Sequence, residues 1–359
     1  MMASVGGADY EQVVHCWDAR SGLRAIIAVH STALGPALGG TRFRPYPSEQ
    51  AALLDVLRLA RGMSYKAAAA GLDLGGGKAV ILGDPRTDKT EPLLRAYGRF
   101  VESLGGRYVT AEDMGTTMAD METIARETRF VTGRATIYGG GGDPSVLTAY
   151  GVRQGMLAVA EHLWGSPDLQ GRHVAVQGIG KVGFLLAGML HEDGARLTVA
   201  DVNRDATARA AAEFGAEVVD PAKIHATNCD ILAPCALGAV INDTTLPELS
   251  CTAICGSANN VLERPDHDAA LVEAGVLYAP DFVVNAGGII NIADELAGGY
   301  NEARARATTD GIRPRLAAVL RRAAESGAPP GQVAERMAEE RMADVSRLRL
   351  LRVLPGQAS

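Results

Sequence analysis

Apolar residues along this chain fall into short continuous runs, which predict buried strands, and into longer runs with helical spacing. In the first part of the chain the strand-like runs are residues 23–32, 78–85 and 107–115. Between them, one helical pattern opens at Ser48 and keeps Val56 and Leu57 on one face, and another covers residues 91–106. This alternation of strands and helices predicts an α/β fold.

A run of four glycines at 139–142 interrupts the alternation. Such a run favours neither helix nor strand, so residues 138–144 are predicted to form a hinge or a loop of close backbone approach. A helical pattern follows at 145–164, then a strand–helix–strand unit at 173–203 and strand-like runs at 229–240, 252–260 and 276–290. From about residue 302 the pattern is helical, with breaks at 311–314 and 327–331. We predict a parallel, doubly wound sheet in this half.

Composition narrows the class of protein. The net charge of −7 and the pI near 5.6 argue against nucleic acid or an anionic membrane as the main partner. No run of about 18 apolar residues predicts a transmembrane helix, and residues 1–12 show no signal-peptide pattern. The five cysteines include no CxxC pair, so they are expected to be free thiols in a reducing cytoplasm and not zinc ligands. The seven histidines include no HExxH motif, so no catalytic metal is predicted.

Residues 62–80 (GMSYKAAAAGLDLGGGKAV) hold two lysines, Lys66 and Lys78, with only Asp73 as a charged residue between them. Lysines in such an apolar run are expected in a dry site, where an amine binds an anion or titrates near neutrality. Lys66 continues the apolar stripe of the helix that opens at Ser48, so it is expected to face the core. The alternative is a lysine that reaches solvent at the end of the helix.

Asp113 lies in the sequence TAEDMG, after a strand-like run and before a glycine, where catalytic loops often begin. Two nearby ammonium groups disfavour full protonation of both, so one lysine could stay charged and hold a carboxylate while the other acts as a base. Asp113 could then shuttle a proton. The alternative for Asp113 is a loop cap or an ion pair with Arg107.

Residues 178–183 form a GxGxxG sequence between the strand-like run HVAVQ and a helical pattern. Gly178 would make the tight turn, Gly180 would let the backbone approach a pyrophosphate, and Gly183 would allow close packing of helix on strand. The full motif is Gly178, Ile179, Gly180, Lys181, Val182 and Gly183. Asp201 ends the next strand-like run, where a carboxylate binds ribose hydroxyls and favours NAD over NADP, although Arg204 nearby leaves NADP possible. A turn that binds nothing and an adenosylmethionine site are the alternatives.

Several longer stretches match one known family. They are ALGGTRF (37–43), residues 62–80, GGRYVTAEDMGT (105–116), GIGKVG (178–183), DILAPCALG (230–238), GSANN (256–260) and YAPDFVVNAGG (278–288). With these stretches spread over nearly the whole chain, the sequence resembles the glutamate/leucine/phenylalanine/valine group of amino acid dehydrogenases, and most closely the actinobacterial valine dehydrogenases. The resemblance implies an NAD-dependent, reversible oxidative deamination of an L-amino acid to a 2-oxo acid and ammonium.

The fold of that family implies two domains around a cleft that closes on the reactants. Residues 1–143 would be an N-terminal α/β domain for substrate binding and oligomerisation, and residues 144–329 would be a Rossmann dinucleotide-binding domain. The helices at about 330–359 would return to the first domain, and the loop at 138–144 would be a crossing between the two. A cytoplasmic homo-oligomer that acts on small molecules is expected, with no nucleic acid or membrane partner.

The resemblance also implies roles for single residues. Lys66 would hold the substrate carboxylate together with the backbone at Gly39 and Gly40. Lys78 would activate water and stabilise charge at the substrate α-carbon, and the three glycines before it would let the backbone come close to the substrate. Asp113 would be the general acid/base. Further contacts would come from Asn260 to the amino group and cofactor, and from Thr148, Asn285 and Asp201 to the cofactor.

Four residues would form an aliphatic pocket for the substrate side chain: Leu38, Ala111, Ile289 and Ile292. Glutamate-active members of the family carry a lysine at the position of Leu38, so a glutamate side chain would be left as an unpaired buried charge. Isoleucine at 289 and 292 narrows the pocket and favours valine over phenylalanine, with leucine still accepted. The alternatives are a leucine- or phenylalanine-preferring enzyme and a non-catalytic NAD-binding sensor.

Overall fold

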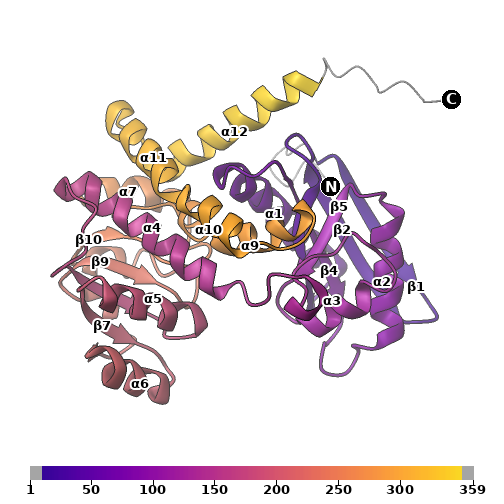
Figure 1. The fold of residues 1–359 in the computed structure, drawn as a ribbon, viewed down its shortest axis with the longest axis horizontal. Coiled ribbons are helices and arrows are strands. Elements are labelled where there is room, and N and C mark those ends of the chain that lie inside the picture. The colour runs from indigo at the N-terminus through magenta and orange to yellow at the C-terminus, as the bar shows by residue number, and fades with distance from the viewer. Residues whose placement is uncertain (1–9, 350–359) are drawn as a thin grey trace. The chain divides into compact units, whose positions relative to one another are not determined.

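The computed structural model describes residues 10–349, and these divide into two compact units (Figure 1). Unit 1 comprises residues 10–142, 295–299 and 337–349, and unit 2 comprises residues 143–294 and 300–336. The predicted α/β fold is confirmed. Two segments lie outside the described part of the chain: residues 1–9 and residues 350–359. The first contains most of residues 1–12, for which no signal peptide was predicted, and the second is the end of the predicted C-terminal helices. Within residues 10–349, no helix is both long enough and apolar enough to cross a membrane.

Unit 1 is built on a five-stranded sheet with the order β1-β2-β4-β3-β5. The strands are β1 (Gln12–Asp18), β2 (Leu23–Ser31), β3 (Ala37–Arg44), β4 (Gly75–Leu82) and β5 (Tyr108–Glu112). The helices are α1 (Glu49–Ala69), α2 (Glu91–Ser103) and α3 (Met118–Ile124), with short 3₁₀ turns η2 (Thr136–Tyr138) and η5 (Glu295–Ala297). Strands β4, β3 and β5 run parallel, whereas β1 and β2 are antiparallel to their neighbours.

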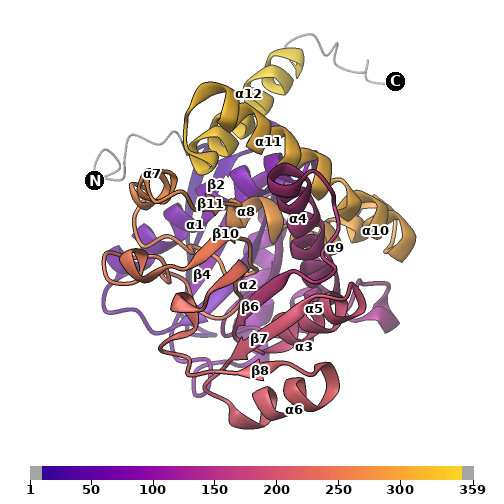
Figure 2. The same ribbon diagram turned by 90° about the vertical axis from the view of Figure 1, so that its left-hand side faces the viewer.

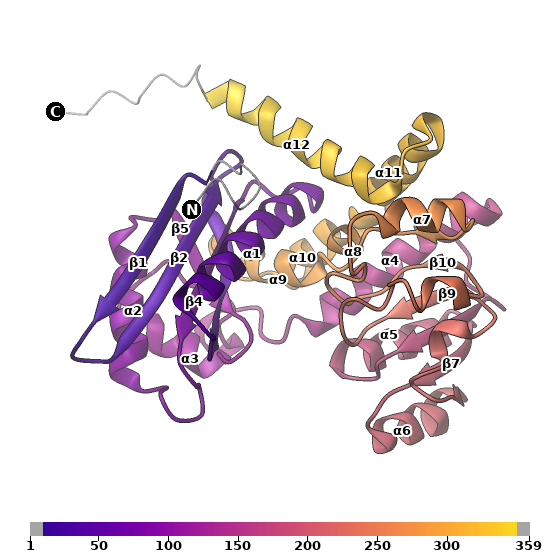
Figure 3. The same ribbon diagram turned by 180° about the vertical axis from the view of Figure 1, so that it is seen from behind.

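The two faces of this sheet are covered by different helices, because successive side chains of β2 point in opposite directions. Ile26 and Ala28 pack with residues of α1, whereas Ile27 and Val29 pack with residues of α2 and α3. Figure 3 shows α1 crossing one face of the sheet. The strand β2 and the helices α1 and α2 are as predicted, but β1 and β3 were not anticipated, and β4 begins three residues before the predicted strand, at Gly75.

Unit 2 is built on a six-stranded, wholly parallel sheet with the order β11-β10-β9-β6-β7-β8, and Figure 2 shows β6, β7 and β8 in this order. The strands are β6 (His173–Gln177), β7 (Arg196–Ala200), β8 (Glu217–Val218), β9 (Cys229–Pro234), β10 (Cys251–Ile254) and β11 (Leu277–Tyr278). The helices are α4 (Ser145–Trp164), α5 (Lys181–Glu192), α6 (Arg204–Phe214), α7 (His267–Glu273), α8 (Asp281–Val284), α9 (Gly287–Asp294), α10 (Glu302–Asp310) and α11 (Ile312–Ser326), with 3₁₀ turns η3 (Ile224–Ala226) and η4 (Leu246–Glu248). Helix α12 (Pro330–Arg349) begins in unit 2 and continues into unit 1. The predicted doubly wound parallel sheet is confirmed.

The predicted strand at 276–290 is wrong for most of its length. Only Leu277 and Tyr278 pair in the sheet, and the rest of the run forms the helices α8 and α9. A short apolar run fits a fully buried helix as well as a buried strand, so the pattern alone could not decide. At Gly287 a Cβ would overlap the carbonyl oxygen of Leu147, which shows how closely α9 packs on α4. Ile289 and Ile292 therefore lie on a helix.

Candidate active site

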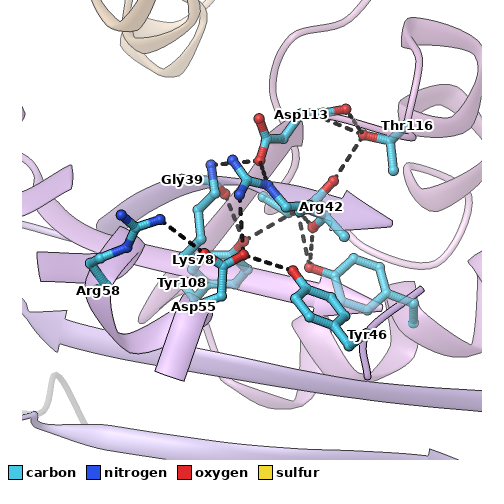
Figure 4. A network of polar contacts seen from close by, with 12 residues as sticks. Gly39, Arg42, Tyr46, Asp55, Arg58, Lys78, Tyr108, Asp113 and Thr116 are labelled. Atoms are coloured by element: carbon cyan, nitrogen blue, oxygen red, sulfur yellow. Dashed lines mark hydrogen bonds and ion pairs between the residues drawn. The ribbon is translucent and has the colours of Figure 1, made fainter. Parts of the chain in front are cut away.

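Three polar side chains from neighbouring strands of unit 1 meet at one point (Figure 4). Lys78 lies on β4 and is only 7% exposed, although it is a lysine. Its Nζ lies 3.0 Å from Oδ2 of Asp113, which directly follows β5. The Nε of Arg42, on β3, donates to the same oxygen at 3.0 Å. The buried amine and the guanidinium thus contact the same oxygen atom of the carboxylate.

The carboxylate of Asp113 is held in its charged form. Burial by itself would raise its pKa, but the adjacent charges of Lys78 and Arg42 hold that pKa below its usual range. The backbone is fixed as well, because the Asp113 N–H donates to Oγ1 of Thr116 at 2.9 Å. The alternative pairing with Arg107 is wrong: Arg107 pairs with a different acid, Glu11, at 3.0 Å.

The glycines that precede Lys78 serve packing inside the protein. A Cβ at Gly75 would overlap the carbonyl oxygen of Ser31, and a Cβ at Gly76 would overlap the backbone nitrogen of Ser64. A Cβ at Gly77 would lie 2.7 Å from the ring of Tyr108. Close contact of β4 with β2, α1 and this tyrosine therefore accounts for the three glycines.

The backbone at Gly39 and Gly40 is buried between β4 and β5. A Cβ at Gly39 would overlap the carbonyl oxygen of Gly77, and the Tyr108 hydroxyl donates to the Gly39 carbonyl oxygen at 2.6 Å. Lys66 is half-buried on α1, two residues after the serine that contacts Gly76. Unit 1 therefore places Lys66 on the helix that packs directly on the strand of Lys78.

The GxGxxG segment of unit 2 has the geometry of a phosphate-binding turn. Gly178 has a φ of +98°, which favours glycine, and a Cβ at Gly183 would overlap the Gly178 carbonyl oxygen. At Gly180 a Cβ would meet no atom within 4 Å, so this side of the turn is open. Helix α5 begins at Lys181, and the unpaired N–H groups of a helix start attract anions. Lys181 itself lies 3.0 Å from Asp143, and Val182 follows it in the first turn.

Asp201 directly follows β7 and contacts this turn through hydrogen bonds. Its Oδ2 accepts the Ile179 N–H at 2.6 Å, and its Oδ1 accepts the Asn203 N–H at 2.8 Å. The carboxylate therefore sits at the carboxyl end of the second strand of the βαβ unit, next to the glycine turn. That is the position from which an acidic residue binds a ribose in dinucleotide-binding folds.

Asn285, which follows α8 in unit 2, has a side-chain oxygen that could accept a hydrogen bond from a ligand. The Nδ2 of Asn285 donates to Oδ1 of Asn259 at 2.9 Å, while its buried Oδ1 has no hydrogen-bond partner among the described residues. Asn260, next in the chain, is exposed and has a φ of +51°. On α4, Thr148 lies against the start of α9, where a Cβ at Gly288 would be 2.9 Å from its Oγ1. The open glycine turn, the helix start and this buried acceptor fit a dinucleotide with an amide group.

The four predicted pocket residues are divided between the units. Leu38 on β3 and Ala111 on β5 are fully buried in unit 1. Ile289 is buried and Ile292 half-buried on α9 of unit 2. All four side chains are aliphatic.

One candidate metal-binding group and five cysteines lie among the described residues. The only group there with metal-ligand geometry is Asp243, Glu263 and His267, and Arg264 already pairs with Asp243 at 2.8 Å. All five cysteines are free, as predicted. Burial raises the pKa of the Cys16 thiol to about 12, which keeps it protonated and unreactive near neutral pH.

Two residues of the site were not identified from the sequence, although one of them lies in a quoted motif. Arg42 belongs to ALGGTRF, but nothing in the pattern showed that its side chain reaches Asp113. Asp55 on α1 accepts from Arg42 at 3.1 Å, and it reads in the sequence as an ordinary polar position of an amphipathic helix.

A buried lysine–aspartate pair in one α/β unit and an open glycine turn in a Rossmann unit are typical of enzymes that use a dinucleotide, and dehydrogenases are the main class of these. Residues 10–130 match the model of the Glu/Leu/Phe/Val dehydrogenase dimerisation domain, and residues 199–345 match that of Glutamate/Leucine/Phenylalanine/Valine dehydrogenase. The chain belongs to this family of amino acid dehydrogenases.

Individual relatives cover almost the whole chain. The sequence is 54% identical to a leucine dehydrogenase of Geobacillus stearothermophilus, over 95% of this chain and 93% of the relative. It is 55% identical to a valine dehydrogenase of Streptomyces coelicolor, over 93% of each chain. Among solved structures, it is similar to the L-tryptophan dehydrogenase of Nostoc punctiforme, with a TM-score of 0.87 and 43% identity over 97% of this chain and 100% of that one.

Proposed function

We propose that the protein catalyses the NAD-dependent, reversible oxidative deamination of a branched-chain L-amino acid, with valine preferred. The products are the 2-oxo acid, ammonium and NADH. The observation that carries the proposal is the buried pair of Lys78 and Asp113, 3.0 Å apart, in a chain of the amino acid dehydrogenase family. Relatives named leucine and valine dehydrogenase, at 54% and 55% identity, support a branched-chain substrate.

In this proposal, residues 178–183 would hold NAD⁺, which would supply the acceptor for the hydride of the substrate α-carbon. Lys66 and the backbone at Gly39 and Gly40 hold the substrate carboxylate. Lys78 activates the water molecule that adds to the substrate imine and stabilises charge at the α-carbon. Asp113 accepts and donates protons while water adds to the imine to form a carbinolamine, and again while the carbinolamine loses ammonia. The carboxylate and the amine are close enough for direct proton transfer, which supports these roles.

The remaining predicted residues orient the reactants. Asn260 would orient the substrate amino group, and Thr148 and Asn285 would bind the nicotinamide end of the cofactor. The buried, unpartnered Oδ1 of Asn285 supports this role, because a carboxamide N–H of the cofactor would give it a partner. Asp201 binds the adenosine ribose and favours NAD over NADP, since its negative charge would repel a 2′-phosphate.

In this proposal valine is preferred because the four side chains expected around the substrate are all aliphatic and two of them are isoleucine. Leu38, fully buried, offers no partner to a side-chain carboxylate, so glutamate is excluded. Isoleucine at positions 289 and 292 leaves less room than valine would, so phenylalanine is disfavoured. A leucine-preferring enzyme is the second candidate, because relatives with that name are nearly as similar to this chain as those named for valine.

We propose further that the enzyme is a cytoplasmic homo-oligomer. The model matched by residues 10–130 describes a dimerisation domain, which supports assembly through unit 1. Five free cysteines, four of them buried, suit a reducing compartment.

An NADH-linked amination assay over a panel of 2-oxo acids tests this function. We expect the highest kcat/KM with the oxo acid of valine and about 10-fold lower values with that of leucine, since one methylene is worth about 1–3 kcal/mol. We expect no turnover with 2-oxoglutarate and weaker activity with NADPH. The highest value with phenylpyruvate would contradict the pocket assignment, and NADH binding without any amination would favour a non-catalytic sensor.

A further inference from the structure

Arg42 lies between two carboxylates that belong to different elements. Its Nε donates to Asp113 Oδ2 at 3.0 Å, and its NH1 donates to Asp55 Oδ2 at 3.1 Å. The arginine side chain is 16% exposed and that of Asp55 15%. A planar guanidinium can hold two acids at fixed angles, which a lysine ammonium cannot do equally well.

Asp55 is itself held from two sides. The Tyr46 hydroxyl donates to its Oδ2 at 2.8 Å, and Arg58 donates to its Oδ1 at 3.2 Å. Both oxygens of Asp55 are therefore engaged before Arg42 is considered. The result is a connected series from Tyr46 through Asp55 and Arg42 to Asp113 (Figure 4).

The series leaves the two oxygens of Asp113 in different surroundings. Oδ2 lies 3.0 Å from both cationic partners, Lys78 and Arg42. In Figure 4 the other carboxylate oxygen points away from both of them. An oxygen that already faces two cations is a poor site for a proton, so the other oxygen is the better one.

We propose that Arg42, held by Asp55, is a positioning residue that fixes the Asp113 carboxylate so that Oδ2 stays with the cations and Oδ1 exchanges the proton. The inference rests on the proposed function, which makes Asp113 the general acid/base. Arg42 holds Asp113 in place while Lys78 turns to water or substrate, because the guanidinium is itself fixed by its second hydrogen bond, to Asp55. Misplacement of a reacting group by about 1 Å lowers a rate by about 100-fold.

The charges around Asp113 set the direction of its titration. Arg42 faces it from β3, Lys78 from β4 and Tyr108 from β5, and Asp55 on α1 acts through Arg42. Burial raises the Asp113 pKa, whereas the two cations lower it. If Arg42 is removed, one lowering influence disappears and the burial remains, so the Asp113 pKa must rise.

The test compares wild type with Arg42→Met, which keeps much of the aliphatic volume and removes the charge. Carbon-13 NMR titration of the Asp113 carboxyl, which needs no activity, should show a pKa above the wild-type value. In amination assays kcat should fall about 100-fold, with a much smaller change in KM for the 2-oxo acid. Arg42→Lys should restore the Asp113 pKa in part and kcat only weakly, because an ammonium cannot hold both acids in the same geometry.

Arg86→Met is the matched control. It also removes a guanidinium from an ion pair with an aspartate, Asp84 at 2.8 Å, but this exposed pair lies outside the series from Tyr46 to Asp113, so both readouts should equal those of wild type. If Arg42→Met fails to fold, Asp55→Asn gives the same two readouts with smaller changes. If wild type is active and Arg42→Met has the wild-type Asp113 pKa and the wild-type kcat, this inference is overturned and the proposed function is not. An inactive wild type would overturn the proposed function and the catalytic part of the inference, while the NMR titration would still decide whether Arg42 holds Asp113.

Discussion

Lys78 is a charged side chain within an otherwise apolar strand, and its carboxylate partner makes that placement possible. A buried charge without a partner is strongly unfavourable, so a lysine here without Asp113 would destabilise β4. The same pair gives the site its chemistry, because amine and carboxylate lie within direct reach of one another. The ion pair between Lys78 Nζ and Asp113 Oδ2 therefore contributes both to the stability of the strand and to the proposed activity.

Replacement of Lys78 by alanine should abolish amination while NADH binding stays at the wild-type level. The lysine belongs to unit 1, whereas the glycine turn at 178–183 belongs to unit 2. We expect a loss of at least about 100-fold in kcat, since general acid–base catalysis contributes about 10²–10⁴-fold. Steady-state kinetics and fluorescence titration with NADH measure the two effects.

Lys89→Ala is the matched control for this substitution. Lys89 forms a similar ion pair with Asp120, 2.7 Å between Nζ and Oδ2, away from the site. The control should lower thermal stability and leave kcat unchanged. Near-normal turnover of the Lys78 variant would remove Lys78 from the mechanism.

At the residue scale, the sequence predicted Lys66, Lys78 and Asp113 as site candidates because their setting is unusual for charged residues. It could not predict Arg42 and Asp55, since an arginine on a strand and an aspartate on an amphipathic helix are ordinary in any surface pattern. Only the pairing of β3 between β4 and β5 brings Arg42 to Asp113. Side-chain partners that depend on strand order cannot be read from spacing along the chain.

At the scale of elements, the predicted strands and helices are correct where the pattern is clear, as in the continuous apolar run of β2 and the helical spacing of α1 and α2. The prediction failed at β3, whose glycines weaken any strand pattern, and at α9, whose apolar run is too short to distinguish helix from strand. Both failures have the same physical cause. Tight packing of glycine against a neighbouring backbone, as at Gly39 and Gly287, depends on tertiary contacts that local sequence does not contain.

The start of helix α12 depends on a buried acid from another helix. Oδ2 of Asp268, on α7, accepts the Gln332 N–H at 3.2 Å, while its Oδ1 has no hydrogen-bond partner among the described residues. Burial raises the pKa of Asp268 to about 6, and the nearby Glu335 acts in the same direction. Because the folded pKa lies above the unfolded one, the stabilisation is complete below pH 4 and is lost as the pH rises through 6.

Asp268→Asn should remove this dependence on pH. Relative to the variant, wild type should lose about 2 kcal/mol of unfolding free energy between pH 4 and pH 7. Denaturant unfolding of both proteins at the two pH values measures the difference. Asp266→Asn is a control of opposite sign, because its hydrogen bonds with Arg264 lower the pKa of Asp266. Parallel pH profiles for wild type and Asp268→Asn would contradict the assignment.

At the scale of the whole molecule, the chain passes between the two units at four places: 142/143, 294/295, 299/300 and 336/337. The glycine run at 139–142 marked the first of these in the sequence. The second crossing, at 294/295, is not indicated by the sequence, because it falls between two acidic residues and such a pair is ordinary in any polar turn. Asp294 pairs with Arg304 inside unit 2, whereas Glu295 binds residues of unit 1. Two adjacent carboxylates are thus anchored to different units.

Glu295 is the anchor of the glycine-rich loop, and both of its oxygens are in use. Oε2 accepts from the Thr132 hydroxyl at 2.8 Å and from the Gly133 N–H at 3.0 Å, and Oε1 accepts from the Gly141 N–H at 2.8 Å. In Glu295→Gln only one oxygen can still accept, because the amide nitrogen is a donor and would face other donors. The loop at 132–141 should then open more often than in wild type.

Hydrogen–deuterium exchange of residues 132–141 tests this anchor. Loss of a hydrogen bond to a charged group is worth about 1.5–3 kcal/mol, so exchange in Glu295→Gln should be about 10- to 100-fold faster. Glu302→Gln, at the exposed start of α10, is the control and should exchange at the wild-type rate. Because the anchored loop adjoins the crossing at 142/143, faster exchange should be accompanied by a lower kcat in amination. Unchanged protection of the loop in Glu295→Gln would show that its glycines, and not this carboxylate, determine the conformation at the crossing.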